Sequence, residues 1–204
     1  ILHLGDYFEH RKYINFKALN QNKRVFLNVL REKGITMDII AGNHDVYFKN
    51  TNSLNSLNEC LKEYDDVVTI HDKCTDLKVD NIQVGLVPWI CLENEKESMD
   101  FLNSTKSQII MGHFELGGFK YMANANIKSH GMDKKTLKRF DAVYSGHYHT
   151  KSTQDNITYL GTQLELSWSD AGDPKYFHIF DTDTREIEPI RNPYTLYEKI
   201  TYDD

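Results

Sequence analysis

Residues 141–150 read DAVYSGHYHT: a short apolar run, then Gly146, then His147 and His149 separated by one residue. The apolar run is typical of a buried β-strand, and the glycine permits a sharp turn where the strand ends. On an extended segment, residues i and i+2 project to the same side. The stretch therefore predicts a strand whose end presents two imidazoles, an arrangement suited to a metal site.

Polar side chains follow a glycine at the end of three other apolar segments. They are Asp6 in LGD (4–6), Asn43 and His44 in AGNHD (41–45), and His113 in MGH (111–113). In open α/β sheets, ligands bind outside the carboxyl ends of strands, so separate strands would each deliver a ligand to one shared site. Asp6 alone is more typical of an ordinary turn and His113 alone of a hydrogen-bonded residue at a strand end, whereas GNHD is more specific; their repetition in one chain favours a metal site.

The residue types restrict which metal such a site would take. Carboxylate, amide and imidazole ligands without a thiolate favour Mn, Fe or Zn over a cysteine-rich structural zinc site. An aspartate among histidines can bridge two ions, and two ions about 3.5–4 Å apart suit phosphoester hydrolysis. We therefore expect two divalent metal ions, Mn first, with Fe, Zn and Mg as alternatives.

The composition is that of an ordinary globular protein, and we predict one domain over residues 1–204. Of the residues, 40% are hydrophobic and 26% charged, and the net charge of −6 argues against binding nucleic acid by bulk attraction. No apolar run approaches the ~18 residues of a membrane span. The three cysteines, Cys60, Cys74 and Cys91, lack C-x-x-C spacing, which favours structural thiols in a reducing cytoplasm.

Periodicity predicts an α/β fold in which strands alternate with helices and then give way to a strand-rich half. The expected helices cover residues 15–33, 53–63, 94–104 and 133–140. The expected strands cover 1–5, 35–40, 66–71, 74–79, 82–90, 108–113, 141–146, 157–162, 176–183 and 186–190. Residues 115–131 show no steady period and are predicted to form a long loop, which in compact domains is often functional.

The order of five motifs is recognisable: GDYFEHRK (5–12), GNHD (42–45), MGHFE (111–115), SGHYHT (145–150) and YLGT (159–162). Together they resemble the calcineurin-like metallophosphoesterases, and within them the SbcD-type DNA double-strand-break repair nucleases. In eukaryotes this is the meiotic-recombination-eleven family, and its members are nuclease partners of SMC-like ATPases. GHFELGGF (112–119) and KSHG (128–131) favour the phage recombination nuclease branch. The resemblance implies a layered α/β/β/α sandwich with mixed sheets.

The resemblance also implies a role for each matching residue. Asp6 would bridge both metals, His149 would bind the first metal, and Asn43, His113 and His147 would complete the shell of the second. His44 would stabilise the transition state or protonate the leaving oxygen, with Asp45 holding its ring as a second catalytic residue. Separately from the resemblance, the residues suggest candidate substrate contacts at Arg11, Lys12 and His130, and at Lys134 and Lys135 within a basic cluster that also contains Lys128, Lys138 and Arg139.

One departure from the family pattern concerns the first metal. Relatives open with an Asp-x-His motif on the first strand, and nothing before LHLGD (2–6) supplies it. We therefore expect the chain to be N-terminally truncated, with a depleted first metal shell. We also expect it to lack the C-terminal segments that relatives use for DNA capping and ATPase binding.

The leading functional prediction is a Mn-dependent DNA exonuclease and endonuclease. It would act with an SMC-like ATPase in double-strand-break repair or recombination, in the cytoplasm of a bacterial or phage-infected cell. One alternative is a phosphatase or small-molecule phosphodiesterase of the same superfamily. A second is a catalytically incomplete fragment that only binds DNA or the ATPase, and a homodimer also stays open.

Overall fold

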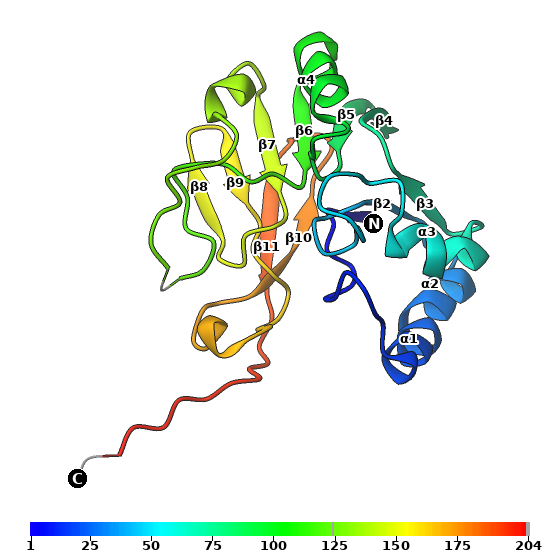
Figure 1. Cartoon of the computed structure of the whole chain (residues 1–204), viewed down its shortest axis with the longest axis vertical. Coiled ribbons are helices and arrows are strands. Elements are labelled where there is room, and N and C mark those ends of the chain that lie inside the picture. Colours follow the sequence, from blue (N-terminus) through cyan, green and yellow to red (C-terminus); the bar gives the residue numbers. More distant parts are fainter. Residues whose placement is uncertain (124, 203–204) are drawn as a thin grey trace.

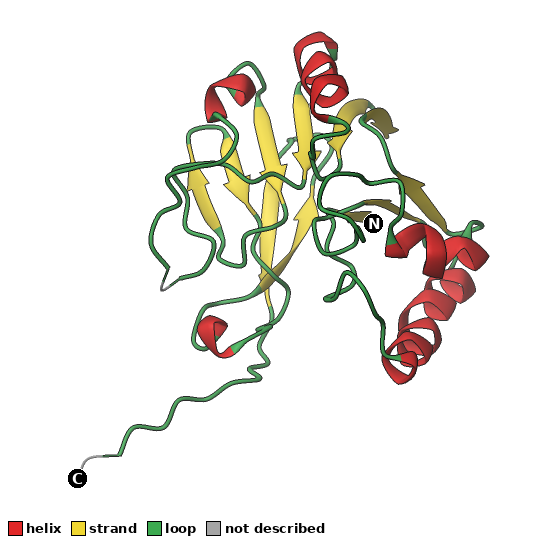
Figure 2. Ribbon diagram, in the orientation of Figure 1, coloured by secondary structure: helices red, strands yellow, loops and turns green. Residues whose placement is uncertain are grey.

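The computed structural model describes residues 1–123 and 125–202, and its strands form two separate sheets and one hairpin (Figures 1 and 2). The smaller sheet has three parallel strands in the order β1 (Leu2–His3), β2 (Met37–Ile40) and β3 (Val68–His71). Its strands all run in one direction, so the segments that leave β1 and β2 emerge at the same edge.

The larger sheet has the strand order β4-β5-β6-β7-β9-β8. Its strands are β4 (Thr75–Val79), β5 (Ile82–Val87), β6 (Ile109–Gly112), β7 (Ala142–Ser145), β8 (Ser152–Gln154) and β9 (Ile157–Tyr159). The neighbours from β5 to β9 pair in parallel, whereas β4 and β8 are antiparallel edge strands. A separate antiparallel hairpin consists of β10 (Tyr176–Phe180) and β11 (Ile187–Arg191). The sheets are therefore mixed, as predicted.

Helices cover the outer faces of both sheets. The predicted helix at 15–33 is a run of α1 (Phe16–Asn22), the π-helical turn η1 (Lys23–Leu27) and α2 (Asn28–Lys33). Asn15 caps its first turn through its side chain, and Gly34 ends it with a left-handed φ of 62°. The others are α3 (Ser56–Leu61), followed by the 3₁₀ turn η2 (Lys62–Tyr64), and α4 (Glu95–Ser104).

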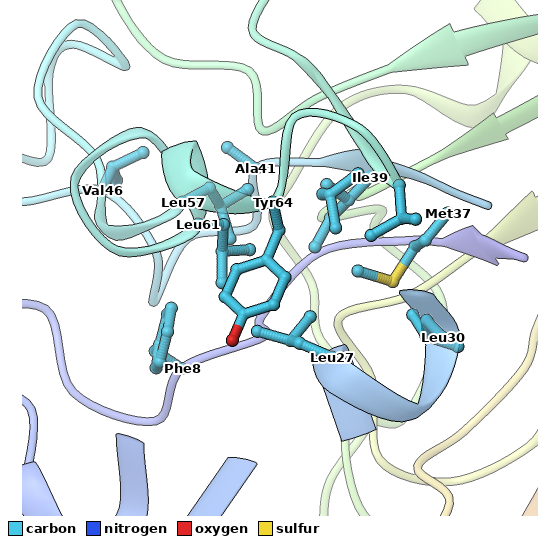
Figure 3. Close-up of a cluster of buried hydrophobic side chains, with 12 residues drawn as sticks. Phe8, Leu27, Leu30, Met37, Ile39, Ala41, Val46, Leu57, Leu61 and Tyr64 are labelled. Atoms are coloured by element: carbon cyan, nitrogen blue, oxygen red, sulfur yellow. The ribbon is translucent and has the colours of Figure 1, made fainter. Parts of the chain in front are cut away.

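Three hydrophobic clusters separate the layers. Leu27, Met37, Ile39, Leu57 and Tyr64 belong to the cluster between the small sheet and α1–α3, shown in Figure 3. A second cluster includes Leu102 of α4, Ile110 and Val143, on the outer face of the large sheet. The third joins the two sheets, with Leu4 and Ile40 from one and Val84, Met111 and Tyr144 from the other. Alternate residues of β2, β5, β6 and β7 thus face different layers, and the predicted sandwich is confirmed.

A few elements differ from the sequence prediction. The segment 133–140, predicted as a helix, contains only the 3₁₀ turn η3 (Lys134–Leu137). The short edge strand β8 and the 3₁₀ turn η4 (Trp168–Asp170) were not predicted, because three residues carry too little periodicity to detect. The predicted loop at 115–131 has no named helix or strand in its described part, and residue 124 lies outside the described residues. No described helix is long and apolar enough to cross a membrane.

Candidate metal centre

The carboxyl ends of four parallel strands, two from each sheet, lead to one place. Asp6 follows β1, Asn43 follows β2, His113 follows β6 and His147 follows β7. The glycines before them let the segments approach closely: a Cβ on Gly42 would collide with the backbone nitrogen and Oδ1 of Asp6. The motif of a strand, a glycine and a polar residue therefore brings the polar side chains together at the strand ends, as the sequence predicts.

The side chains of Asp6, His113 and His147 each offer a ligand atom, and these atoms lie within 4.8 Å of one another. Asn43 joins them, because its Oδ1 lies 3.0 Å from Nε2 of His113. The same Nε2 lies 3.2 Å from Oδ2 of Asp6. Four residues that the sequence assigned to one metal are thus brought together, with His113 fully buried at their centre.

The hydrogen bonds of this group indicate which nitrogen of His113 carries a proton. His113 Nδ1 lies 2.6 Å from the carbonyl oxygen of Leu4, which can only accept, so this nitrogen carries a proton. In a neutral imidazole Nε2 then presents a lone pair, and it faces the oxygens of Asn43 and Asp6. Acceptors that converge without a donor require either an extra proton or a cation. The donor set of carboxylate, amide oxygen and imidazole fits a divalent metal ion.

The same contacts shift the pKa values of the titratable residues in this group. Burial lowers the pKa of His113, but the charge of Asp6 and the hydrogen bond between them outweigh it and raise that pKa above its ordinary value. Burial would raise the pKa of Asp6, yet the charge and hydrogen bond of His113 hold it well below its usual range. Burial, with the charge of His113 second, lowers the pKa of His147 to about 3. His147 is therefore neutral near pH 7, the form that binds metal.

The backbone is strained at two of these residues. Asp6 has φ of 55° and His147 has φ of 82°, both in the left-handed region that residues with a Cβ seldom adopt. Such conformations cost on the order of 1–3 kcal/mol each and cluster at functional sites.

Asp45 has a different role from the predicted one. Its buried carboxylate accepts backbone N–H groups from Asp6 (2.8 Å), Phe8 (3.1 Å) and Gly42 (2.8 Å). Burial nevertheless raises its pKa to about 6. The prediction that Asp45 holds the ring of His44 is therefore corrected: Asp45 fixes the two turns that carry the ligands.

His44 is oriented by other groups. Its ring Nδ1 lies 2.6 Å from the carbonyl oxygen of Glu9, so Nδ1 donates and Nε2 faces outward. Its backbone N–H donates to Oδ1 of Asp6 at 2.7 Å. His44 is half-buried, which leaves it accessible to a substrate beside Asp6.

His149, predicted to bind the first metal, lies outside the group formed by Asp6, His113 and His147. Its Nδ1 lies 3.2 Å from Oδ1 of Asp170, a carboxylate that is only 1% exposed. The buried Lys175 donates to Asp170 (3.2 Å), to Asp173 (2.8 Å) and to the carbonyl of His149 (2.9 Å). The two imidazoles of SGHYH thus belong to different clusters.

The predicted substrate residues are scattered. Arg11 is half-buried, and Lys12 and His130 are exposed. Lys134 pairs with Asp155 at 3.6 Å and Lys135 with Asp133 at 3.9 Å. Lys128 forms an ion pair with Glu115, and Lys138 is exposed.

Arg139 has a structural role instead. Its guanidinium donates to the carbonyls of Leu102 and Thr105 at the end of α4.

Trp89 and Asp170 are two neighbours of the site that the sequence did not reveal. The ring of Trp89 lies 5.4 Å from that of His147 and 6.0 Å from that of His113, centroid to centroid. Trp89 lies two residues after the end of β5 in VPWI (87–90), so its position near a strand end was an available signal. Asp170 lies 21 residues after its partner His149 in an irregular segment and carried no such signal.

Comparison with known proteins agrees with this geometry. Residues 1–151 match the family described as calcineurin-like phosphoesterase. The chain is 37% identical over 198 residues to exonuclease subunit 1 of Enterobacteria phage T4; the match covers 97% of this chain and 57% of that protein. The chain therefore spans little more than half the length of that relative.

One solved structure, titled as a novel archaeal phosphodiesterase, aligns with 94% of this chain and 81% of its own. The sequence identity is 13% and the TM-score 0.44, which is too low to support a conclusion about fold or activity.

Proposed function

Because the chain belongs to the calcineurin-like phosphoesterase family, we propose that it is a metal-dependent nuclease that hydrolyses phosphodiester bonds in DNA. One observation carries the proposal: the ligand atoms of Asp6, His113 and His147 converge within 4.8 Å, and Nε2 of His113 faces oxygens of Asp6 and Asn43, so that a proton on that nitrogen or a cation is needed between them. The identity of 37% to a phage exonuclease subunit supports a nuclease within the family.

The residues around this group have distinct tasks in the proposed reaction. Divalent ions bound there would activate a water molecule and neutralise the phosphate oxygens. Asp6 keeps one carboxylate oxygen on the His44 N–H and turns the other toward His113, so its orientation is fixed before any ion binds. His44 keeps Nδ1–H on the Glu9 carbonyl, so Nε2 would hand a proton to the leaving oxygen from the imidazolium form, in which both ring nitrogens carry a proton.

We propose two ions, with Mn²⁺ first. Asp6, Asn43, His113 and His147 would hold one of them. His149 would contribute to the other through Nε2, because its Nδ1 is directed at Asp170. Action with an SMC-like ATPase in DNA repair or recombination extends the proposal; its support is that the phage relative is named as a subunit.

The two alternatives make different predictions. A phosphatase or small phosphodiesterase would use the same ions on a small ester. A catalytically incomplete module would bind DNA or the ATPase without cleaving either. A homodimer is compatible with each of the three functions.

The test is a Mn²⁺ titration of nuclease activity on end-labelled duplex DNA, with bis(p-nitrophenyl) phosphate and p-nitrophenyl phosphate as small esters. We expect Mn²⁺-dependent cleavage of DNA, loss of cleavage in EDTA, and a fall of about 10²–10⁴-fold in His44→Ala, the usual contribution of an acid–base group. His178→Ala, a histidine of the β10–β11 hairpin with no part in the proposed reaction, is the matched control. Hydrolysis of the monoester without cleavage of DNA would reject the proposal.

A further inference from the structure

We infer that Tyr47, Phe48 and Tyr13, with Lys12 between them, form a stacking platform that holds unpaired nucleotides of a DNA strand beside the metal centre. We call these four residues the aromatic platform. This inference rests on the proposed function, because it names the form of DNA that the same site would receive. It adds a base-binding surface to a site so far defined by phosphate chemistry.

The aromatic platform is built from two loops that meet. The ring of Tyr47 contacts that of Phe48 edge to face, with centroids 4.7 Å apart. Nζ of Lys12, from the other loop, lies 5.7 Å from the centroid of the Tyr47 ring. On the Lys12 side the ring of Tyr13 stacks on that of His10 with centroids 4.6 Å apart. The Tyr47 ring thus has the Phe48 ring and the Lys12 cation as neighbours, and Tyr13 follows Lys12 directly in the first loop.

These aromatic rings are exposed, unlike those that pack the core. Tyr13 is 67% exposed, Phe48 50% and Tyr47 37%, whereas Tyr148 and Tyr159 are almost fully buried. Isolated exposed aromatics are normal, but grouped ones beside a candidate active site mark an interaction surface. Each ring leaves a third or more of its surface in solvent, which is available for contact with a ligand.

Both loops are fixed to the metal centre through Asp45. Its carboxylate holds the N–H groups of Asp6 and Phe8 in the first loop. Its carbonyl accepts the N–H of Ser56, and the N–H of Tyr47 donates to the carbonyl of Leu54, which closes the second loop. Because these loops are already held in place, binding a strand there carries little entropic cost for ordering them.

The platform also lies near the catalytic groups. The carbonyl of Glu9 holds the ring of His44, and His10 is the next residue along that loop. Tyr47 is three residues after His44, a separation that spans at most about 10 Å of extended chain. One or two nucleotides stacked on the platform would therefore leave the adjoining phosphate close to His44 and Asp6.

The chemistry of these side chains favours unpaired bases over duplex DNA. A flat aromatic face can stack on any base, but only when the base is free of its partner strand. Lys12 would meet the phosphate that follows, and its positive charge suits any strand regardless of sequence. We therefore expect preference for single-stranded ends, with little preference among the four bases.

The experiment measures binding by fluorescence anisotropy in Ca²⁺ or EDTA, so that the probe is not cut. Three labelled probes are compared: a blunt duplex, the same duplex with a four-nucleotide overhang, and that overhang made abasic. Variants are Tyr47→Ala, Phe48→Ala, Tyr47→Trp and Lys12→Ala. Tyr194→Ala, an equally aromatic residue that is 78% exposed elsewhere, is the control.

We expect the wild type to bind the natural overhang at least about fivefold more tightly than the abasic one, the effect of one lost base–aromatic stack. Tyr47→Ala and Phe48→Ala should remove that difference, and Tyr47→Trp should keep it. Lys12→Ala should weaken all three probes alike. Equal affinity for natural and abasic overhangs, or unchanged preference in both alanine variants, would overturn the inference.

The two proposals fail separately. DNA cleavage in Mn²⁺ by a protein that ignores unpaired bases would reject the platform and leave the nuclease standing. Base-dependent binding by a protein that never cleaves DNA would reject the nuclease function and support the platform as a DNA-binding surface.

Discussion

His147 and His149 are two residues apart, yet they belong to clusters of opposite character. Around His147, Nε2 of His113 faces oxygens of Asp6 and Asn43, so that a proton on that nitrogen or a cation is needed between them. Around His149 the acceptors are matched, because Lys175 donates to two aspartates and to the His149 carbonyl. The two clusters contain similar residue types and differ in whether a protein donor is present for the converging acceptor atoms. That difference, more than residue type, distinguishes a candidate metal site from a structural cluster.

The largest effect is expected from breaking the matched cluster. Lys175→Met removes a buried ammonium and leaves Asp170 without its ion pair, which should lower the free energy of unfolding by about 3–5 kcal/mol. Urea denaturation measures the change. Lys134→Met, which breaks a more exposed pair, is the control and should cost less than about 1 kcal/mol. Similar losses in both variants would remove the distinction between the clusters.

In the unmatched cluster we expect an effect on metal affinity with little loss of stability. Asp6→Asn keeps an oxygen for the His44 N–H but removes the negative charge that faces His113. Mn²⁺ affinity should fall by more than the about 10–100-fold that changes outside the ligand shell cost. Calorimetric titration measures it, with thermal unfolding in EDTA as the check on folding. A variant that kept wild-type affinity would show that Asp6 is not a ligand.

The smallest effect, counted per pH unit, concerns the stability of the metal-free protein. Burial lowers the pKa of His147 from 6.5 to about 3, so between these values the unfolded chain binds a proton that the native state does not. This contribution makes metal-free protein less stable as pH falls from about 6.5 toward 3, at up to about 1.4 kcal/mol per pH unit.

His147→Asn should lack this part of the slope. The measurement is urea unfolding in EDTA at several pH values, taken as the difference between wild type and variant, so that other titrating groups cancel. Parallel pH profiles for the two proteins would contradict the assigned pKa shift.

The sequence predicted the cluster around His147 well because a short local pattern marks each of its members. Each ligand follows a strand and a glycine, and the carboxyl ends of parallel strands must meet. The family match confirms the predicted superfamily, and the alternation of apolar residues predicted the layers. The role of each residue as a metal ligand stays a prediction.

The matched cluster could not be predicted, because its contacts join residues that no short pattern relates. Asp170 ends the short turn η4 and Lys175 follows in a loop, and only the fold brings Asp170 into contact with His149 and Lys175. The prediction for Asp45 was wrong for a related reason. An acid next to a histidine in sequence favours a hydrogen bond between the two side chains. In the structure the Asp45 carboxylate accepts three backbone N–H groups instead, and His44 donates to the Glu9 carbonyl.

The most direct test of the central claim is a Mn²⁺ titration of the metal-free protein near pH 7.5, followed by loss of the free-ion electron paramagnetic resonance signal. The account predicts saturable binding that Asn43→Ala and His147→Asn weaken strongly and that Lys134→Met leaves unchanged. If Mn²⁺ did not bind, or if both cluster variants bound it as tightly as the wild type, the unmatched acceptors would not be a metal site.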